Sequence, residues 1–198
     1  MLASVNRDGV VQVWHADKGI LIDEPLANLD YTGSNTLVFH DNQTMVVGQK
    51  DGLVVLREDG GEWLPKDAVR TARPRFLQSK NGVIFSVGRA GIAAYALESG
   101  RLVIRKRPKD ERDQAAHAPS ALRDLLSGSV TGCHILEKDD LAVFTTLPGK
   151  VVVWDLLHQI ELFSFDTLQG GIKRFTLRND GTLITCGVDG SIKIWPIH

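Results

Sequence analysis

Histidine and cysteine side chains are the best candidates for metal binding or nucleophilic chemistry, and their spacing in this sequence argues against both. The six histidines lie far apart, and no two have the i, i+4 spacing that places two imidazoles on one helix face. Cys133 and Cys186 lie in separate predicted strands, without the close spacing of a metal knuckle or a redox pair. We expect two buried free thiols, with a disulfide or a metal site as the alternatives.

The sequence signatures of common catalytic sites are also missing. The chain contains no Gly-x-Ser-x-Gly, no Walker loop, no Cys-x-x-Cys and no His-Glu-x-x-His. Its acidic residues fall mainly in predicted turns, where Asp and Asn bond to the local backbone. We therefore expect no catalytic residue, no cofactor and no metal. An enzyme that gathers carboxylates from several parts of the chain is the least favoured alternative.

Composition places the chain among globular proteins. Of its 198 residues, 43% are hydrophobic and 24% are charged, and the net charge of −1 gives no overall attraction to nucleic acid or to a membrane. The N-terminal residues lack the apolar core of a signal sequence, and no window approaches the roughly 20 apolar residues of a membrane span. We expect a soluble protein without membrane contact, located in the cytoplasm, with the nucleus as the alternative.

The chain repeats itself. Residues 2–14 and residues 183–195 each contain a β-rich run, an Asp-Gly turn and an alternating strand that ends in Trp five residues after the Gly. Further copies follow when the glycine of the turn is used as the anchor, and most intervals are close to the roughly 40–45 residues of a four-stranded propeller blade. The anchors are Gly9, Gly52, Gly91, Gly149 and Gly190.

The repeat predicts an all-β chain of antiparallel sheets. A small four-stranded sheet cannot bury both of its faces alone, so neighbouring sheets must stack, as the blades of a β-propeller do. We expect a single propeller domain of about five blades, the first and last incomplete. A charged, Ala-rich insertion at 105–129 interrupts the period and has a short predicted helix at 120–126, and residues 65–74 are predicted as loop. The blades are residues 1–26, 36–64, 75–104, 130–167 and 172–198.

These residues resemble the WD-repeat family of β-propellers. The resemblance implies a buried hydrogen-bond network in each blade, made by the Asp of the turn, a Ser or Thr of the preceding strand, the Trp and a His from a Gly-His pair. No Gly-His pair occurs in the chain. The first unit supplies Ser4, Asp8 and Trp14, and the last supplies Thr185, Asp189 and Trp195. The fourth supplies only Trp154, with Phe144 in the Ser position; the second keeps Asp51, with Val47 and Arg57 in the other two positions; the third keeps Ser86, with Ala90 and Ala96.

The first and last units lack one strand each, because the chain begins at a second strand and ends at a third strand. The chain is therefore either part of a longer propeller, whose missing blades another chain supplies, or an incomplete five-bladed ring. We favour the first alternative, because an open ring exposes sheet faces and edges that associate.

Basic residues gather in the turns and links that blade geometry places at one end of the sheets, while the opposite turns are mostly acidic. We expect this basic face to bind an acidic or phosphorylated protein segment through charge-assisted contacts. RNA is the alternative partner, and solvated turns without a partner are the third alternative. The predicted function is a non-catalytic scaffold for a multiprotein complex, with a ribonucleoprotein subunit as the alternative. The proposed contacts are Arg7, Lys50, Arg89, Arg105, Lys106 and Arg107, with Lys66, Arg70 and Arg73 in the links.

Overall fold

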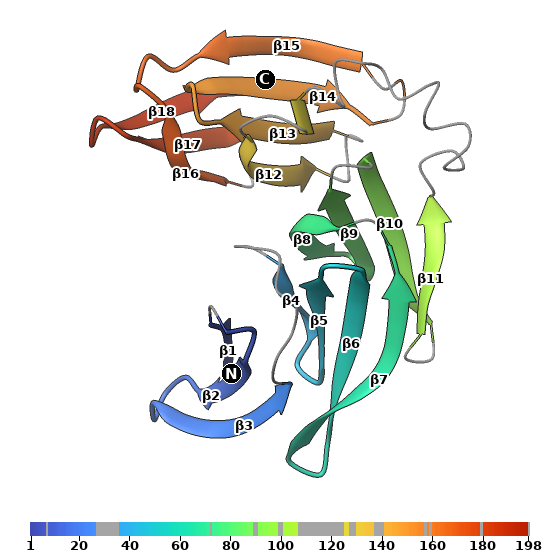
Figure 1. The fold of residues 1–198 in the computed structure, drawn as a ribbon. Helices are drawn as coiled ribbons and strands as arrows, with labels where there is room; N and C mark the ends of the chain where they lie inside the picture. Colours follow the sequence, from blue (N-terminus) through green and yellow to red (C-terminus); the bar gives the residue numbers. More distant parts are fainter. Residues whose placement is uncertain are drawn as a thin grey trace. The chain divides into compact units, whose positions relative to one another are not determined.

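The computed structural model consists of antiparallel sheets (Figure 1). It describes residues 1–6, 8–26, 36–71, 73–88, 91–98, 101–106, 125–126, 130–136, 141–156, 158, 160–178 and 180–197, with only the main chain described at 26, 98 and 101–106. The strands of the described part form five sheets, and each sheet follows chain order. The expected all-β fold is confirmed. In the described residues no helix is long and apolar enough to cross a bilayer.

The chain divides into two compact units, Met1–Glu111 and Arg112–His198. The assignment of the whole chain to a single domain therefore stays a prediction. The first unit holds three sheets, which are three-, four- and four-stranded in chain order. Their strands are β1 (Leu2–Val5), β2 (Val11–His15) and β3 (Ile20–Leu26); β4 (Leu37–Asp41), β5 (Thr44–Gln49), β6 (Gly52–Asp59) and β7 (Glu62–Arg70); and β8 (Pro74–Lys80), β9 (Val83–Gly88), β10 (Gly91–Glu98) and β11 (Arg101–Lys106).

The second unit holds a four-stranded and a three-stranded sheet. Most of the predicted helix at 120–126 lies outside the described residues, although Leu125 and Leu126 are helical and Leu126 is buried. The strands of this unit are β12 (Val130–Leu136), β13 (Leu141–Thr146), β14 (Lys150–Asp155) and β15 (Ile160–Asp166); and β16 (Ile172–Leu177), β17 (Thr182–Gly187) and β18 (Ile192–Pro196).

Two predicted loop boundaries are wrong. Residues 65–74 were expected as loop, but β7 continues to Arg70 and β8 begins at Pro74. Pro65 is tolerated because β7 is the outer strand of its sheet and Pro65 pairs with Leu56, where the ladder shifts register. Similarly, β11 extends to Lys106, so the first two residues of the expected insertion belong to a strand.

One hairpin of each sheet has a turn of one of two lengths. These hairpins are β1–β2, β5–β6, β9–β10, β13–β14 and β17–β18. In the first sheet Val5 pairs with Val11, so residues 6–10 form the turn, and the fourth and fifth sheets have turns of the same length. In the second sheet Gln49 pairs with Gly52, which leaves only residues 50–51 in the turn, and the third sheet is similar. The turn glycines therefore serve different purposes. Gly190 adopts a positive φ of 81° in a long turn, whereas a Cβ on Gly52 would collide with the carbonyl oxygen of Val69.

Neighbouring sheets of one unit pack face to face, and the same positions make each contact. The earlier sheet presents the two residues that stand three places and one place before its Trp position: Val11 and Val13, Leu53 and Val55, or Val151 and Val153. The later sheet presents its own Trp position. These packed residues are Leu56 in the second sheet, Tyr95 in the third and Trp195 in the fifth.

Candidate functional site

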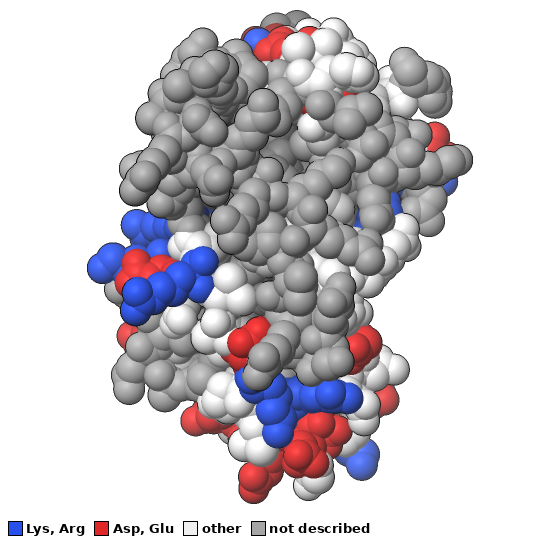
Figure 2. Space-filling view, turned by 90° about the vertical axis from the view of Figure 1, so that its right-hand side faces the viewer, with Lys and Arg blue, Asp and Glu red and all other residues white. Residues whose placement is uncertain are grey.

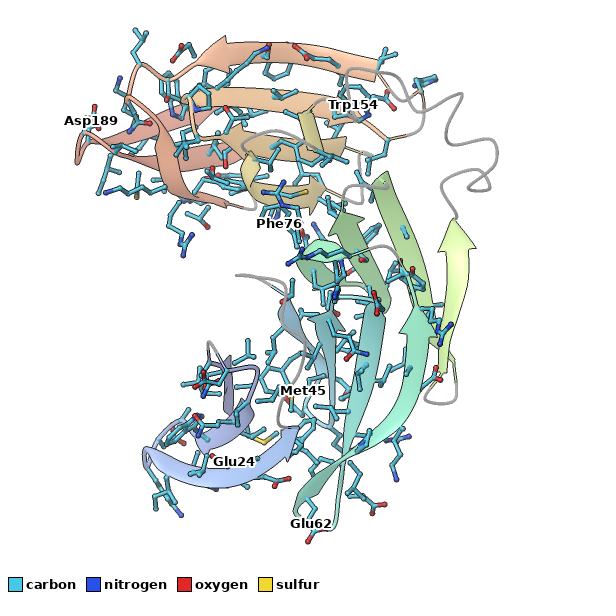
Figure 3. All side chains as sticks on the ribbon, in the orientation of Figure 1. Glu24, Met45, Glu62, Phe76, Trp154 and Asp189 are labelled. Carbon is cyan, nitrogen blue, oxygen red and sulfur yellow. The ribbon has the colours of Figure 1, made fainter. Side chains whose placement is uncertain are left out.

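A chain of hydrogen bonds holds Trp195 in the last sheet. The indole Nε1 of Trp195 donates to Thr185 Oγ1 over 2.9 Å, and the Thr185 hydroxyl donates to Gln169 Oε1 over 2.5 Å. The amide of Gln169 then donates to Ser191 Oγ at 2.9 Å and to the Ser191 carbonyl at 3.0 Å. Ser191 Oγ in turn donates to Asp189 Oδ1 at 2.7 Å. The network joins the interior of the sheet to the tip of the β17–β18 hairpin, where Figure 3 labels Asp189.

Gln169 is the member that sequence reasoning missed. Its side chain is fully buried, and it accepts from Thr185 while donating to Ser191. The WD-repeat resemblance implies a histidine from a Gly-His pair as the linking residue, and this chain has no such pair. A glutamine also offers an acceptor and donors on one side chain, and it therefore joins the same kinds of partner.

Two turn carboxylates of this sheet have lowered pKa values. The backbone N–H and the hydroxyl of Ser191 both donate to Asp189, and these bonds, with a smaller attraction from Lys193, lower the pKa of its carboxyl below the ordinary value of 3.8. Hydrogen bonds from Thr182 and the nearby Arg178 lower the pKa of Asp180 in the same way. Both carboxylates are exposed, and the hydrogen bonds that lower their pKa values come from residues of their own turns.

In the first sheet the Trp and the hydroxyl meet in the same way. Trp14 Nε1 donates to Ser4 Oγ at 3.2 Å. The turn is organised by Asn6, whose Oδ1 accepts from the backbone N–H of Asp8 at 2.9 Å and of Val10 at 3.0 Å. Asp8 itself lies exposed in this turn.

In the fourth sheet Phe144 stands at the position that Ser4 and Thr185 hold in the first and last sheets, so the side chain at this position offers no hydroxyl to the indole of Trp154. Trp154 is only 1% exposed and Phe144 is fully buried. Among the described residues, the indole N–H of Trp154 has no hydrogen-bond partner. Burial of both rings therefore replaces the polar contact made in the first and last sheets; Figure 3 labels Trp154.

In the second and third sheets the predicted Trp positions are wrong by one residue. The register places Leu56 and Tyr95 there, in place of Arg57 and Ala96. The shorter turns move the strand by one residue relative to the anchoring glycine, and a shift of one residue exchanges the two faces of a strand. The Tyr95 hydroxyl donates to Thr71 Oγ1 at 3.1 Å. Asp51 accepts from the Thr71 N–H at 3.2 Å, through its main-chain carbonyl.

The predicted basic face is described only in part. Lys50 is exposed in the β5–β6 turn, and Arg70 lies beside this turn because it pairs with Gly52. Arg7, Arg89 and Arg107 lie outside the described residues, and Arg105 and Lys106 are described only by their main chain in β11. On the face shown in Figure 2, Lys and Arg side chains are interspersed with Asp and Glu. The acidic segment and the RNA expected as partners therefore stay predictions.

Lys66 does not belong to the basic face. It was expected in a link between blades, but it lies within β7, and its Nζ is 3.5 Å from Asp59 Oδ2 at the opposite end of the sheet. The extension of β7 past Pro65 explains this difference.

The residue types of metal and thiol chemistry remain dispersed. The described residues contain no group of three or more His, Cys, Asp or Glu that could hold a metal ion. Cys133 and Cys186 are free, and burial raises the pKa of the Cys133 thiol, which keeps it protonated at neutral pH.

The last sheet leaves one face uncovered. Ile192 and Ile194 stand three places and one place before Trp195, as Val151 and Val153 stand before Trp154. The two valines are fully buried, whereas the two isoleucines are 68% and 66% exposed. These isoleucines thus occupy the positions that contact the following sheet in each packed pair.

The first sheet leaves the complementary face uncovered. Val11 and Val13 pack on the second sheet, and Trp14 points the other way in the strand alternation. Beside Trp14 lie its ladder partners Leu2 and Leu21, which are 57% and 40% exposed. Among the described residues, the first and last sheets therefore present uncovered faces of complementary kinds.

The likeness of this chain to known proteins lies in its fold. No family model and no curated protein sequence matches it. It is similar to the computationally designed protein Ika8, with a TM-score of 0.59 and 19% identity over 98% of this chain and 55% of that chain. It is also similar to the designed protein Ika4, with a TM-score of 0.53 and 17% identity over 89% of this chain and 98% of that chain. The WD40 β-propeller domain of Doa1 gives a TM-score of 0.57 and 16% identity over 97% of this chain and 60% of that chain.

At these identities the comparison concerns architecture alone. The chain spans 55% of Ika8 and 60% of the Doa1 domain. The five antiparallel sheets of the described residues, three of them four-stranded and the first and last three-stranded, are the blades of such a fold. The fold is that of a β-propeller, with an incomplete first and last blade.

Proposed function

We propose that the chain is a non-catalytic protein-interaction module of the WD-repeat type, and that the uncovered faces of its first and last sheets bind protein. One observation carries the proposal: Ile192 and Ile194 are 68% and 66% exposed at positions where Val151 and Val153 are fully buried. A blade with apolar side chains on both faces is stabilised by a neighbour on each.

The partner we propose is a second copy of the same chain. In each packed pair, one sheet contributes the face that holds the two positions before its Trp position, as Ile192 and Ile194 do in the last sheet. The other sheet contributes the face that holds its Trp position, as Trp14 does in the first sheet. The described residues leave such a face uncovered on the first sheet and on the last, so the last sheet of one copy has the complementary surface on the first sheet of another. Such a contact is head-to-tail, and it generates a ring when the rotation closes. Assembly of a larger complex would build on this contact.

Sedimentation equilibrium of the full chain at increasing concentration tests the proposal. We expect the wild-type mass to rise above that of one chain, and the variant Ile192→Lys/Ile194→Lys to remain at one chain, because two charges would be buried unpaired in the contact. The matched control is Ile160→Lys/Leu162→Lys, an exposed apolar pair on β15 with exposed fractions of 52% and 46%. A wild-type mass of one chain throughout, unchanged in both variants, would rule the proposal out.

A further inference from the structure

A polar cavity of about 260 Å³ opens between the second and third sheets of the first unit. Strands β4, β5, β6, β7 and β10 all contribute to it, so the cavity depends on the packing of these two sheets. None of its lining residues belongs to the uncovered faces of the first and last sheets. Its lining residues are His40, Asp41, Thr44, Val55, Arg57, Lys66 and Leu97.

The inner wall of the cavity is buried. Val55 is 1% exposed and Thr44 is 4% exposed. His40 Nδ1 lies 3.2 Å from Ser79 Oγ, a contact that bridges the two sheets and orients the imidazole. A charge that enters this cavity interacts with its lining at a lower effective dielectric constant than in bulk water.

Cationic side chains dominate the charged part of the lining. Arg57 is exposed, and no carboxylate pairs with it in the part of the chain that the structure describes. Lys66 also lines the cavity and is 3.5 Å from Asp59, which is not part of the lining. The one carboxylate in the lining is that of Asp41, whose Oδ1 accepts the backbone N–H of Gln43 at 2.8 Å.

We propose that this cavity binds a phosphomonoester group. The guanidinium of Arg57 offers a planar fork for two phosphate oxygens, Lys66 offers a point charge, and His40 offers an imidazole nitrogen. A phosphomonoester has three terminal oxygens, so it can engage three separate groups, whereas a carboxylate has two. The volume is below that of pockets for drug-sized ligands and suits a phosphate with a short attachment.

Calorimetric titration of the full chain with inorganic phosphate, and with a peptide that carries one phosphoserine, tests the proposal. We expect saturable binding that Arg57→Gln weakens about tenfold, the loss of one charge-assisted contact. The variant should fold normally because Arg57 is exposed. Lys18→Gln is the matched control, since it removes an exposed cation that does not line the cavity.

The two ligands distinguish the source of the phosphate group. Binding of both, each weakened by Arg57→Gln, identifies a site for free phosphate compounds. Binding of the phosphopeptide alone, with no binding of its unphosphorylated form, identifies a site for a modified protein. Absence of saturable binding by either ligand, or equal weakening by Lys18→Gln, overturns the proposal. None of these outcomes depends on self-association, so the two proposals fail separately.

Discussion

Trp154 and Trp195 hold the same position in adjacent sheets, but they are stabilised by different interactions. Trp154 is 1% exposed, packs in a four-stranded sheet and leaves its indole N–H without a partner among the described residues. Trp195 is partly exposed in a three-stranded sheet, and its N–H begins a network that reaches Asp189 through Thr185 and Gln169. The comparison teaches that a fully packed indole tolerates an unpaired donor, whereas the indole in the sheet with an open face relies on its polar network.

The largest expected effect comes from Gln169→Leu. The substitution removes the bonds to Thr185 and Ser191 and leaves the fully buried Thr185 hydroxyl without its acceptor, so we expect the free energy of unfolding to fall by about 3 kcal/mol. Urea unfolding followed by tryptophan fluorescence measures it. Gln43→Leu makes the same change at an exposed position and should cost little. A similar loss in both variants would mean that the network contributes nothing specific.

The substitution Thr185→Val should cause the next largest loss in the free energy of unfolding. It keeps the side-chain volume but removes the acceptor of Trp195 and the donor to Gln169, and we expect a loss of about 2 kcal/mol. The corresponding change in the first sheet, Ser4→Ala, should cost less than about 1 kcal/mol because Ser4 is exposed. The same unfolding measurement compares the two, and a larger loss for Ser4→Ala contradicts the account.

The two tryptophans themselves give a smaller and sharper contrast. Trp154→Phe loses packing but also removes an unpaired buried donor, so we expect a change within about 1 kcal/mol. Trp195→Phe should cost more, although Trp195 is less buried, because it breaks the bond to Thr185. Burial alone predicts the opposite order, so the ranking of the two unfolding free energies decides between the explanations.

The smallest expected effect is a dependence of the folding stability on pH in the acid range. The pKa of Asp189 is lowered in the folded chain, so its contribution to stability is present above the ordinary value of 3.8 and is lost as pH falls through the folded value. Asp189→Asn should therefore flatten the decline in unfolding midpoint on the acid side of that value. Identical acid profiles for both proteins would show that the Ser191 bonds do not persist in solution.

The sequence predicted the sheets well because short apolar or alternating runs mark the strands and each long turn carries a glycine with a positive φ. The positions of Ser4 with Trp14 and of Thr185 with Trp195 also followed from the repeat, and their side chains are within hydrogen-bond distance. These features are local. A pattern of alternating residues and turn glycines contains them directly.

The remaining features depend on contacts that a repeat pattern does not contain. The two-residue turns of the second and third sheets shift the Trp position to Leu56 and Tyr95, and a glycine anchor cannot reveal that shift. Gln169 was missed because its role arises from two partners distant in sequence, Thr185 and Ser191. The phosphate cavity combines residues of two sheets, so no sequence motif marks it.

One mixing experiment tests the central claim, that the uncovered faces of the first and last sheets bind each other between copies. The variant Ile192→Lys/Ile194→Lys keeps only the face of the first sheet, and Leu2→Lys/Leu21→Lys keeps only the face of the last. By native mass spectrometry we expect each variant alone to be a single chain and their equimolar mixture to contain a species of two chains. A mixture that stays at one chain, or variants that each associate alone, would contradict the account.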